Sequence, residues 1–565
     1  MRILLISHAF NSLTQRLYVE LAGQGHEVSV EFDINDSVTT EAVELFRPDL
    51  ILAPYLRRAI PEAIWRSHLC LIVHPGPVGD RGPSALDRAI LRGESEWGVT
   101  VLQAEAEMDA GPVWASENFA MRPAGKSSLY RNEVTEATVR ALGTALARLP
   151  DYRAGRWQPI RPPLGPLLPL LGQAERAIDW ARDDTATVLR KIAAADGFPG
   201  VADQLFGQDC HLYDARAFAA SGRPGELIGR AGAGIVRATV DGAVRIGHCR
   251  RRDGLAIKLP SVQAFPEADE LPELAADDGV IRYREEGAVA ILEFDFYNGA
   301  MAPADCQALL AAYRAALQRP TRVIVLAGGA DFFSNGLDLK RIEAAGSPAD
   351  ESMRNIEAMD DLCQAIIETG SHLTVAALRG NAGAGGAFLA LAADRVWARD
   401  GVILNPHYKN MGNLYGSEYW TYLLPRRVGA DHAGAIMAHR LPLGVAEAVA
   451  LGFIDGHFGA APAEFLDRVV AEAVALAAAP DFAERLAEKR AQRAVDEAAR
   501  PLADYRAAEL RHMRRNFYGF DPSYHVARHH FVHKTPLSWT PRHLAAHREL
   551  GWRVPEEERE IVIPA

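Results

Sequence analysis

The glycine-rich run at residues 380–386 is the clearest candidate for a catalytic turn. It reads Gly-Asn-Ala-Gly-Ala-Gly-Gly and leads into an apolar, helix-forming segment. Because glycine has no Cβ and tolerates positive φ, such a turn lets the backbone approach a ligand closely. The first N–H groups of the helix that follows have no intrahelical partner, and two N–H groups aimed at one oxygen would stabilise an oxyanion. A tight packing turn is the alternative interpretation.

A second glycine turn lies upstream of this run. Residues 322–329 have the pattern of a buried strand and end in glycines, and a segment containing Gly336, Leu337 and Asp338 follows. The strand, the turn, the Asp-Leu helix start and the later glycine run together resemble the crotonase (enoyl-CoA hydratase/isomerase) superfamily over residues 280–470. This resemblance implies that the N–H groups of Leu337 and Gly385 polarise the carbonyl of an acyl-CoA thioester.

The chain departs from the hydratases of that superfamily at both acid/base positions. Phe388 stands where their first catalytic Glu is expected, and Tyr408 stands at the second. Adding water across a double bond needs two carboxylates, so we expect no hydratase activity. His407, Tyr415 and Glu418 remain nearby. A Tyr408–Glu418 pair in a water-poor pocket could move one proton, with burial raising the pKa of the Glu. The alternative is that these aromatic residues only line a core.

A histidine-containing loop near the N-terminus carries a second candidate site. His74 ends a strand-like run and opens a Pro- and Gly-rich loop, and Asp109-Ala110-Gly111 follows about 35 residues later. This pattern resembles the 10-formyltetrahydrofolate formyltransferases over residues 1–160. The resemblance assigns catalysis to His74 and Asp109, because an imidazole oriented by a carboxylate both stabilises a tetrahedral oxyanion and shuttles a proton. Ile72 replaces the usual Asn of that family, so oxyanion stabilisation falls more heavily on His74 or comes from elsewhere.

The start of the chain predicts a binding site for an anionic group. Residues 2–6, 16–23 and 27–32 have a strand–helix–strand pattern typical of a parallel sheet. A helix N-terminus at the carboxyl end of a strand favours anions, although the polar residues there could equally cap the helix. The usual GxGxxG motif of dinucleotide-binding sites is absent here, so the sequence does not indicate a dinucleotide ligand. The cofactor-binding residues that we predict for 10-formyltetrahydrofolate and coenzyme A (CoA) are Asn11, Ser12, Gln15, Arg81 and Arg131.

Composition excludes several classes of protein. The 565 residues are 48% hydrophobic and 24% charged, and the net charge of -12 argues against nucleic acid as a partner. Five scattered cysteines without CxxC spacing favour a reducing, cytoplasmic location. The first apolar run is too short for an export signal, and no run approaches the roughly 18 apolar residues of a membrane span.

The rest of the chain predicts further domains and linkers. A Pro-rich spacer at 161–172 precedes short strands that resemble the small OB-like barrel of methionyl-tRNA formyltransferases, and residues 266–280 form an acidic linker. We expect an α/β multidomain protein with a formyltransferase-type Rossmann-like parallel sheet, an OB-like β-barrel, a crotonase-type ββα spiral and a helical C-terminal tail. The corresponding ranges are 1–160, 161–265 (spacer and barrel), 280–470 and 471–565.

Two features of the C-terminal region have alternative interpretations. The charged helical stretch 489–518 carries Arg511, Arg514 and Arg515, and it forms either a solvated or oligomer-packing helix or a clamp on CoA phosphates. His525, His529 and His533 share one helical face, as metal ligands can. No carboxylate or Cys joins them in the run, so we expect packing and surface roles and no bound metal.

The combination of a formyl-folate half and an acyl-CoA half resembles the HypX (HoxX) family of hydrogenase-maturation proteins. That resemblance implies a bifunctional enzyme. Its first site transfers formyl from 10-formyltetrahydrofolate to CoA, and its second releases carbon monoxide from formyl-CoA for the iron of [NiFe]-hydrogenase, with transient contact to hydrogenase assembly proteins. One alternative is a formyl-folate enzyme with another acceptor, or water, and a non-catalytic CoA-binding scaffold. The other is a non-catalytic CoA sensor or chaperone-like partner.

Overall fold

The chain forms two compact units. The computed structural model describes residues 1–275 and 279–548. The first unit contains residues 1–123, 129–171 and 536–548, and the second contains residues 124–128, 172–275 and 279–535. Part of the predicted acidic linker (276–278) and the end of the predicted helical tail (549–565) lie outside the described residues. Within the described part of the chain, no helix is both long and apolar enough to cross a lipid bilayer.

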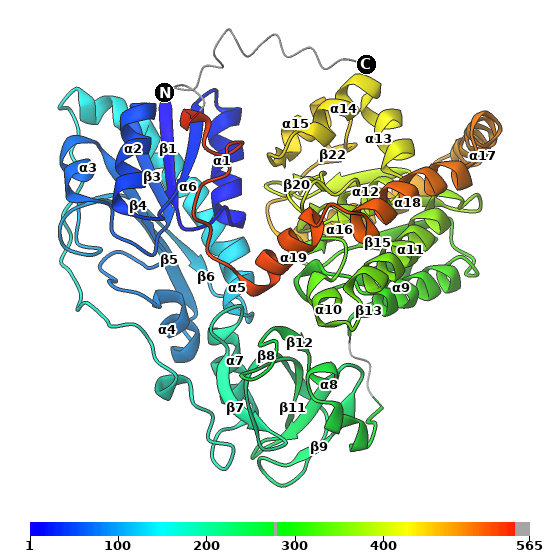
Figure 1. Ribbon diagram of the computed structural model, residues 1–565, viewed down its shortest axis with the longest axis horizontal. Helices are drawn as coiled ribbons and strands as arrows, with labels where there is room; N and C mark the ends of the chain where they lie inside the picture. The colour runs from blue at the N-terminus through cyan, green and yellow to red at the C-terminus, as the bar shows by residue number, and fades with distance from the viewer. Residues whose placement is uncertain (276–278, 549–565) are drawn as a thin grey trace. The chain divides into compact units, whose positions relative to one another are not determined.

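The first unit is built on a six-stranded sheet in the order β2-β1-β3-β4-β5-β6 (Figure 1). Strands β1 to β4 are parallel, as predicted, because helical crossovers connect them. Strands β5 and β6 are antiparallel, so the sheet is mixed. The strands are β1 (Arg2–Ser7), β2 (Glu27–Phe32), β3 (Leu50–Tyr55), β4 (Cys70–His74), β5 (Glu96–Gln103) and β6 (Val113–Ala120). The helices of this unit are α1 (Ser12–Gly23), α2 (Asp36–Phe46), α3 (Glu62–Ser67), α4 (Ala85–Arg92) and α6 (Thr135–Arg153). Residues 126–128 of the short helix α5 (Lys126–Leu129) belong to the second unit.

The end of the described chain returns to the edge of this sheet. β2 is an edge strand, and exposed edges leave backbone N–H groups without partners. The Val30 N–H donates to the Leu544 carbonyl at 2.9 Å, and the Phe32 N–H donates to Thr540 Oγ1 at 2.8 Å. His547 is fully buried and lies 2.8 Å from Glu31 Oε2. Residues 536–548 therefore complete the first unit.

The second unit begins with an antiparallel sheet in the order β7-β8-β11-β10-β9, with β12 paired to β11. Its curved strands share one apolar core with helix α7 (Thr185–Ala195), which agrees with the predicted OB-like barrel (Figure 1). The strands are β7 (Val201–Leu205), β8 (Gln208–Phe218), β9 (Leu227–Ala231), β10 (Gly234–Ala238), β11 (Ala243–Arg251) and β12 (Lys258–Pro260).

The larger part of the second unit has two sheets that are built by repetition. Successive turns of chain add one strand to each sheet, as in the pairs β15/β16, β17/β18 and β19/β20. The first sheet contains β13 (Ile281–Glu286), β14 (Val289–Phe294), β15 (Val323–Ala327), β17 (Leu373–Leu378), β19 (Arg395–Ala398) and β22 (Gly456–His457). The second contains β16 (Phe332–Ser334), β18 (Asn381–Gly383), β20 (Ile403–Asn405) and β21 (Leu443–Gly444). The helices are α9 (Pro303–Ala316), α10 (Leu339–Ala344), α11 (Pro348–Ile367), α12 (Gly385–Leu391), α13 (Trp420–Val428), α14 (Ala430–Ala438) and α15 (Val445–Ala450).

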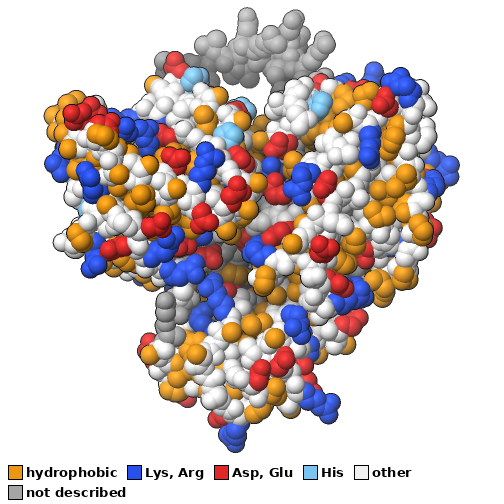
Figure 2. Space-filling view, turned by 180° about the vertical axis from the view of Figure 1, so that it is seen from behind, with side chains coloured by type: hydrophobic (Ala, Val, Ile, Leu, Met, Phe, Trp, Pro, Cys, Tyr) orange, Lys and Arg blue, Asp and Glu red, His pale blue; other side chains and the backbone are white. Residues whose placement is uncertain are grey.

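Four helices follow, and they confirm the predicted helical region as far as His533. The stretch predicted as one helix over 489–518 is two helices, because Pro501 cannot continue a helical hydrogen-bond ladder. Arg511, Arg514 and Arg515 are exposed. On the face drawn in Figure 2, Lys and Arg side chains are interspersed with Asp and Glu. The four helices are α16 (Pro462–Ala478), α17 (Phe482–Ala499), α18 (Leu502–Tyr518) and α19 (Ser523–His533).

Candidate active sites

The topology of the second sheet explains why the two glycine turns meet. β16 pairs in parallel with β18, and β18 pairs in parallel with β20. The carboxyl ends of parallel neighbours lie at the same edge of a sheet. The Gly336–Leu337 turn, the Gly385 turn and the segment that carries Tyr408 follow these three strands in order. One sheet edge therefore collects them.

Two backbone amides adjoin at this edge. Gly336 has φ +77°, and a Cβ added to it would lie 3.2 Å from the Gly385 nitrogen. Among the described residues, neither the Leu337 N–H nor the Gly385 N–H donates a hydrogen bond to another group of the chain. Gly385 also begins helix α12, where N–H groups lack intrahelical acceptors. Two adjacent free donors at a helix start have the geometry of an oxyanion cradle.

Glu418 faces this cradle with one free oxygen. Its side chain is almost fully buried, and within the described chain Oε1 has no hydrogen-bond partner. A Cβ added to Gly385 would overlap Oε1, so the free oxygen lies directly against the Gly385 backbone. The other oxygen, Oε2, accepts hydrogen bonds from Tyr408 Oη at 2.5 Å and from the Ser417 N–H at 3.2 Å. An unpartnered buried carboxylate oxygen is costly, and it commonly marks a functional site.

The surroundings of Glu418 favour its neutral form near pH 7. Burial, reinforced by the nearby Asp360 carboxylate, raises the pKa of Glu418 to about 8. Burial and the adjacent Glu418 also raise the pKa of Tyr408 well above its usual value. The ionised form of Glu418 is consequently a stronger base than an ordinary carboxylate.

Two further buried carboxylates, which sequence analysis missed, accept hydrogen bonds from the backbone at and beside Glu418. Asp360 of α11 accepts from the Glu418 N–H at 2.8 Å, and Glu509 of α18 accepts from the Tyr419 N–H at 3.0 Å. Ser417 Oγ lies within 2.9 Å of Asp360 Oδ2 and 3.2 Å of Glu509 Oε2. Burial raises the pKa of Asp360 to about 7, and burial together with Asp360 raises that of Glu509 to about 8.

These contacts hold a strained stretch of backbone. Glu418 and Tyr419 have φ values of 59° and 58°, and Ala384, directly before Gly385, has φ 47° and ψ -129°. Residues other than Gly rarely adopt such backbone angles, and each residue that does so costs of order 1–3 kcal/mol of conformational strain. Backbone hydrogen bonds to Asp360 and Glu509 hold Glu418 and Tyr419 in these conformations. The same backbone conformation directs the Glu418 side chain toward the cradle.

The remaining residues predicted for this site divide into two groups. Phe388 is buried and stacks on Tyr408 with ring centroids 5.5 Å apart, so an aromatic ring fills the place of a hydratase Glu. His407 is buried near the start of the same segment. Tyr415 instead stacks on His512 of α18, with centroids 4.0 Å apart, and its backbone N–H donates to Asn516.

The first unit brings His74 together with two carboxylates. His74 ends β4 and is buried. Its Nδ1 lies 3.6 Å from Asp109 Oδ2, which agrees with the predicted pair. Its Nε2 lies closer, 2.8 Å, to Asp80 Oδ2, a contact that sequence analysis missed. Asp109 has φ 53° and accepts from the Gly82 N–H at 2.9 Å, which anchors the loop over the histidine.

The predicted cofactor-binding residues have structural contacts of their own. Asn11 caps helix α1 by accepting from the Thr14 N–H at 3.0 Å, so one of its two proposed roles is observed. Gln15 Nε2 donates to the Phe10 carbonyl. Arg81 is buried and bonds the Met108 carbonyl and Glu107, which braces the Asp109 turn. Ser12 begins α1, and Arg131 lies in the π-helical turn Tyr130–Val134, half-buried.

Family models match three parts of the chain. The enoyl-CoA hydratase/isomerase model matches residues 291–542. The formyl transferase model matches residues 27–146, and the model of the formyl transferase C-terminal domain matches residues 170–263. Both resemblances that the motifs indicated are therefore confirmed.

Relatives extend the match to the whole chain. Methionyl-tRNA formyltransferase of Paraburkholderia phymatum is 30% identical over 225 residues, which cover 38% of this chain and 68% of the relative. HypX from Aquifex aeolicus in complex with tetrahydrofolic acid has a crystal structure with a TM-score of 0.94 and 46% identity, covering 98% of this chain and all of that one. Hydrogenase maturation factor HoxX of Bradyrhizobium diazoefficiens is 58% identical over 556 residues, 97% of each chain. The chain therefore belongs to the HypX (HoxX) family of hydrogenase maturation factors.

Proposed function

We propose that the protein makes carbon monoxide in two steps, for the iron of a [NiFe]-hydrogenase. The first unit transfers formyl from 10-formyltetrahydrofolate to the thiol of CoA, and the second unit decarbonylates the formyl-CoA. The observation that carries the second step is the free Oε1 of Glu418 beside the unpaired Leu337 and Gly385 amides. The Aquifex aeolicus relative with bound tetrahydrofolic acid supports folate as the donor for the first step.

In the first unit, His74 stabilises the oxygen of the formyl group during transfer and moves the proton of the thiol. Its imidazole lies between Asp80 and Asp109, and these two carboxylates orient the ring. The ring stabilises, through a hydrogen bond, the oxyanion formed when sulfur adds to the formyl group, and the thiol proton passes to the departing folate nitrogen. The C–S bond forms in this addition, and the C–N bond breaks when the tetrahedral oxyanion collapses.

In the second unit, the Leu337 and Gly385 amides hold the thioester oxygen and draw electron density from the formyl C–H bond. Ionised Glu418 takes the formyl proton through Oε1, while Tyr408 donates to Oε2 and stabilises the carboxylate. The C–S bond breaks, carbon monoxide leaves, and Glu418 returns the proton to the thiolate. The products are one CO and one CoA thiol for each formyl-CoA, so no oxidant or reductant is needed.

The test is a reconstitution with purified protein, 10-formyltetrahydrofolate and CoA. CO is followed by haemoglobin spectroscopy and formyl-CoA by mass spectrometry. Wild-type protein is expected to release CO. His74→Ala should stop both products, whereas Glu418→Gln should accumulate formyl-CoA and lose about 10²-fold or more in CO release.

The variants also separate the alternatives. Tyr408→Phe keeps the ring that stacks on Phe388 and removes the hydroxyl, so it should behave like Glu418→Gln. Tyr415→Phe is the matched control, because Tyr415 stacks on His512. Absence of CO from wild type, or equal CO yields from wild type and Glu418→Gln, would reject the proposed second step and leave a formyltransferase with another acceptor.

A further inference from the structure

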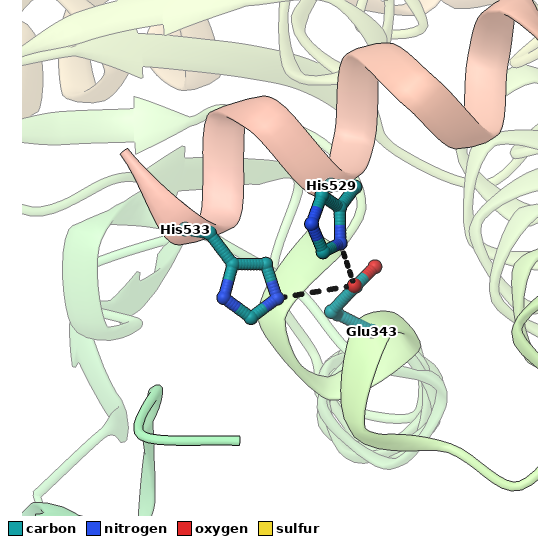
Figure 3. A group of neighbouring side chains, drawn as sticks. All are labelled: Glu343, His529 and His533. Carbon is teal, nitrogen blue, oxygen red and sulfur yellow. Dashed lines mark hydrogen bonds and ion pairs between the residues drawn. The ribbon is translucent and has the colours of Figure 1, made fainter. Parts of the chain in front are cut away.

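Helices α10 and α19 bring three metal-binding side chains to one point that is separate from the site above. His529 and His533 lie at positions i and i+4 of α19, and both point toward Glu343 of α10 (Figure 3). His529 Nδ1 lies 2.8 Å and His533 Nε2 3.2 Å from the same oxygen, Glu343 Oε1. The two imidazole centroids are 4.2 Å apart.

These distances suit a metal ion with small adjustments. The three donor atoms all lie within 4.8 Å of one another. Zn²⁺ binds imidazole nitrogen and carboxylate oxygen at roughly 2.0–2.2 Å in tetrahedral geometry. Such bonds separate neighbouring donors by about 3.4 Å. The observed contacts of 2.8 and 3.2 Å need to open by about 0.6 and 0.2 Å to admit the ion.

The carboxylate is already oriented for single-oxygen ligation. Arg528 Nε donates to Glu343 Oε2 at 2.8 Å, so Oε1 alone faces the two histidines. Both Glu343 and Arg528 are nearly buried, and Arg528 is itself fixed by His525 Nδ1 at 2.8 Å. Outer partners that orient a ligand are typical of metal sites.

The site is also accessible. The His529 side chain is 55% exposed and that of His533 is 24% exposed. An ion could therefore enter from solvent and keep a coordination position for water or another ligand. Two histidines and one carboxylate with an open position are the donor set of many zinc sites, and imidazole ligands favour zinc, copper and nickel over magnesium.

We propose that Glu343, His529 and His533 bind a borderline divalent transition-metal cation, with one coordination position open to an exogenous ligand. The sequence run alone gave no such expectation, because the carboxylate lies 186 residues from His529. The residues between the histidines are His530, Phe531 and Val532. They supply no Glu base of the metalloprotease type, so the proposal is a binding site and not a hydrolytic one.

The experiment uses the full chain after treatment with a chelator. Zn²⁺ is titrated in competition with a chromogenic chelator, Co²⁺ is added as a spectroscopic probe of coordination, and Mg²⁺ serves as the hard-cation control. Wild-type protein should bind one Zn²⁺ per chain and give the visible absorption of four-coordinate Co²⁺. His529→Ala and His533→Ala should each weaken Zn²⁺ binding by about tenfold or more.

His530→Ala is the matched control, because this exposed neighbour on the same helix has no contact with Glu343 among those described. It should bind Zn²⁺ as wild type does. His529 is half exposed, so its replacement should leave the unfolding temperature of the metal-free protein unchanged. Failure of wild type to bind Zn²⁺, or equal affinity in wild type and the His529→Ala/His533→Ala double variant, would overturn the proposal.

Discussion

Tyr408 and Glu418 share a 2.5 Å hydrogen bond through Glu418 Oε2, while Oε1 of the same carboxylate lies free against Gly385. The two oxygens therefore have different environments. Oε2 is held by the protein, and Oε1 is available to a ligand that occupies the amide cradle. A single carboxylate with one anchored and one free oxygen is suited to taking a proton and giving it back.

The first prediction concerns the space at Gly385. Gly385→Ala puts a methyl group where Glu418 Oε1 now lies, so Glu418 or the cradle must shift. We expect CO release from formyl-CoA to fall by about 10²-fold or more, because such a shift misaligns donor and base. Formyl transfer by the first unit should continue. The matched control is Gly434→Ala on α14, where a Cβ meets no atom within 4 Å; a comparable loss in that variant would contradict the interpretation.

The pH dependence of CO release from formyl-CoA follows from the raised pKa of Glu418. Only the ionised carboxylate accepts the formyl proton, and the pKa of Glu418 is about 8. The kcat/KM for CO release should therefore rise about tenfold per pH unit below pH 8 and level off above it, because kcat/KM follows the ionisation of the free enzyme. Single-turnover CO measurements across this range check the sign. A rate that falls with rising pH would instead assign the neutral acid as the active form.

Asp360 should determine the pH at which the rate of CO release reaches half its maximum. Its negative charge disfavours ionisation of Glu418, so Asp360→Asn should lower the pKa of Glu418 and move the midpoint of the rate profile to lower pH. The Asn side-chain oxygen can still accept from the Glu418 N–H. Asp361→Asn is the control, because this neighbour is half exposed and its charge is screened by water. Equal midpoints in wild type and Asp360→Asn would show that Asp360 acts only on the backbone.

Asp80 should matter for formyl transfer. It lies closer to the His74 imidazole than Asp109 does, at 2.8 Å against 3.6 Å. Asp80→Asn weakens the closer of the two contacts that orient the ring, and we expect formyl-CoA production to fall by about tenfold or more. CO release from supplied formyl-CoA should not change. Glu62→Gln, on an exposed ion pair of α3, is the control.

His547 should contribute to the stability of the first unit. His547→Ala removes a fully buried partner of Glu31 and leaves the carboxylate with Arg548 and Thr540. Removing a hydrogen-bond partner of a buried charged group costs about 1.5–3 kcal/mol, and we expect a loss of this size because Arg548 still pairs with Glu31. Thermal unfolding measures this loss, with His68→Ala as the control, because the His68 ring contacts the exposed Ser67.

The sequence predicted those parts of the sites that depend on short segments. The glycine turns carried the crotonase resemblance, which assigned the amides of Leu337 and Gly385. The loop after His74 carried the formyltransferase resemblance, which assigned His74 and Asp109. Local patterns suffice there because parallel strands bring their carboxyl ends together whatever the rest of the chain does. The family resemblances supplied the roles of these residues.

The supporting residues could not be predicted in this way. Asp360 lies in an amphipathic helix and Glu509 in a charged one, and no local pattern distinguishes a buried carboxylate from a solvated one. Only the fold brings them to the 417–421 turn, 57 and 92 residues away from Ser417. The αL backbone of Glu418 and Tyr419 was equally hidden, because neither residue type predicts positive φ.

The return of residues 536–548 to strand β2 has a consequence for how the protein is made. Glu31 and its histidine partner are 516 residues apart, so the histidine is synthesised long after the strand that it covers. The nascent sheet of the first unit therefore keeps an uncovered edge until residues 536–548 have been made. Contacts so distant along the chain slow folding and leave strand edges open to association. Chains that end before residue 547 should therefore aggregate or be degraded more readily than the full chain.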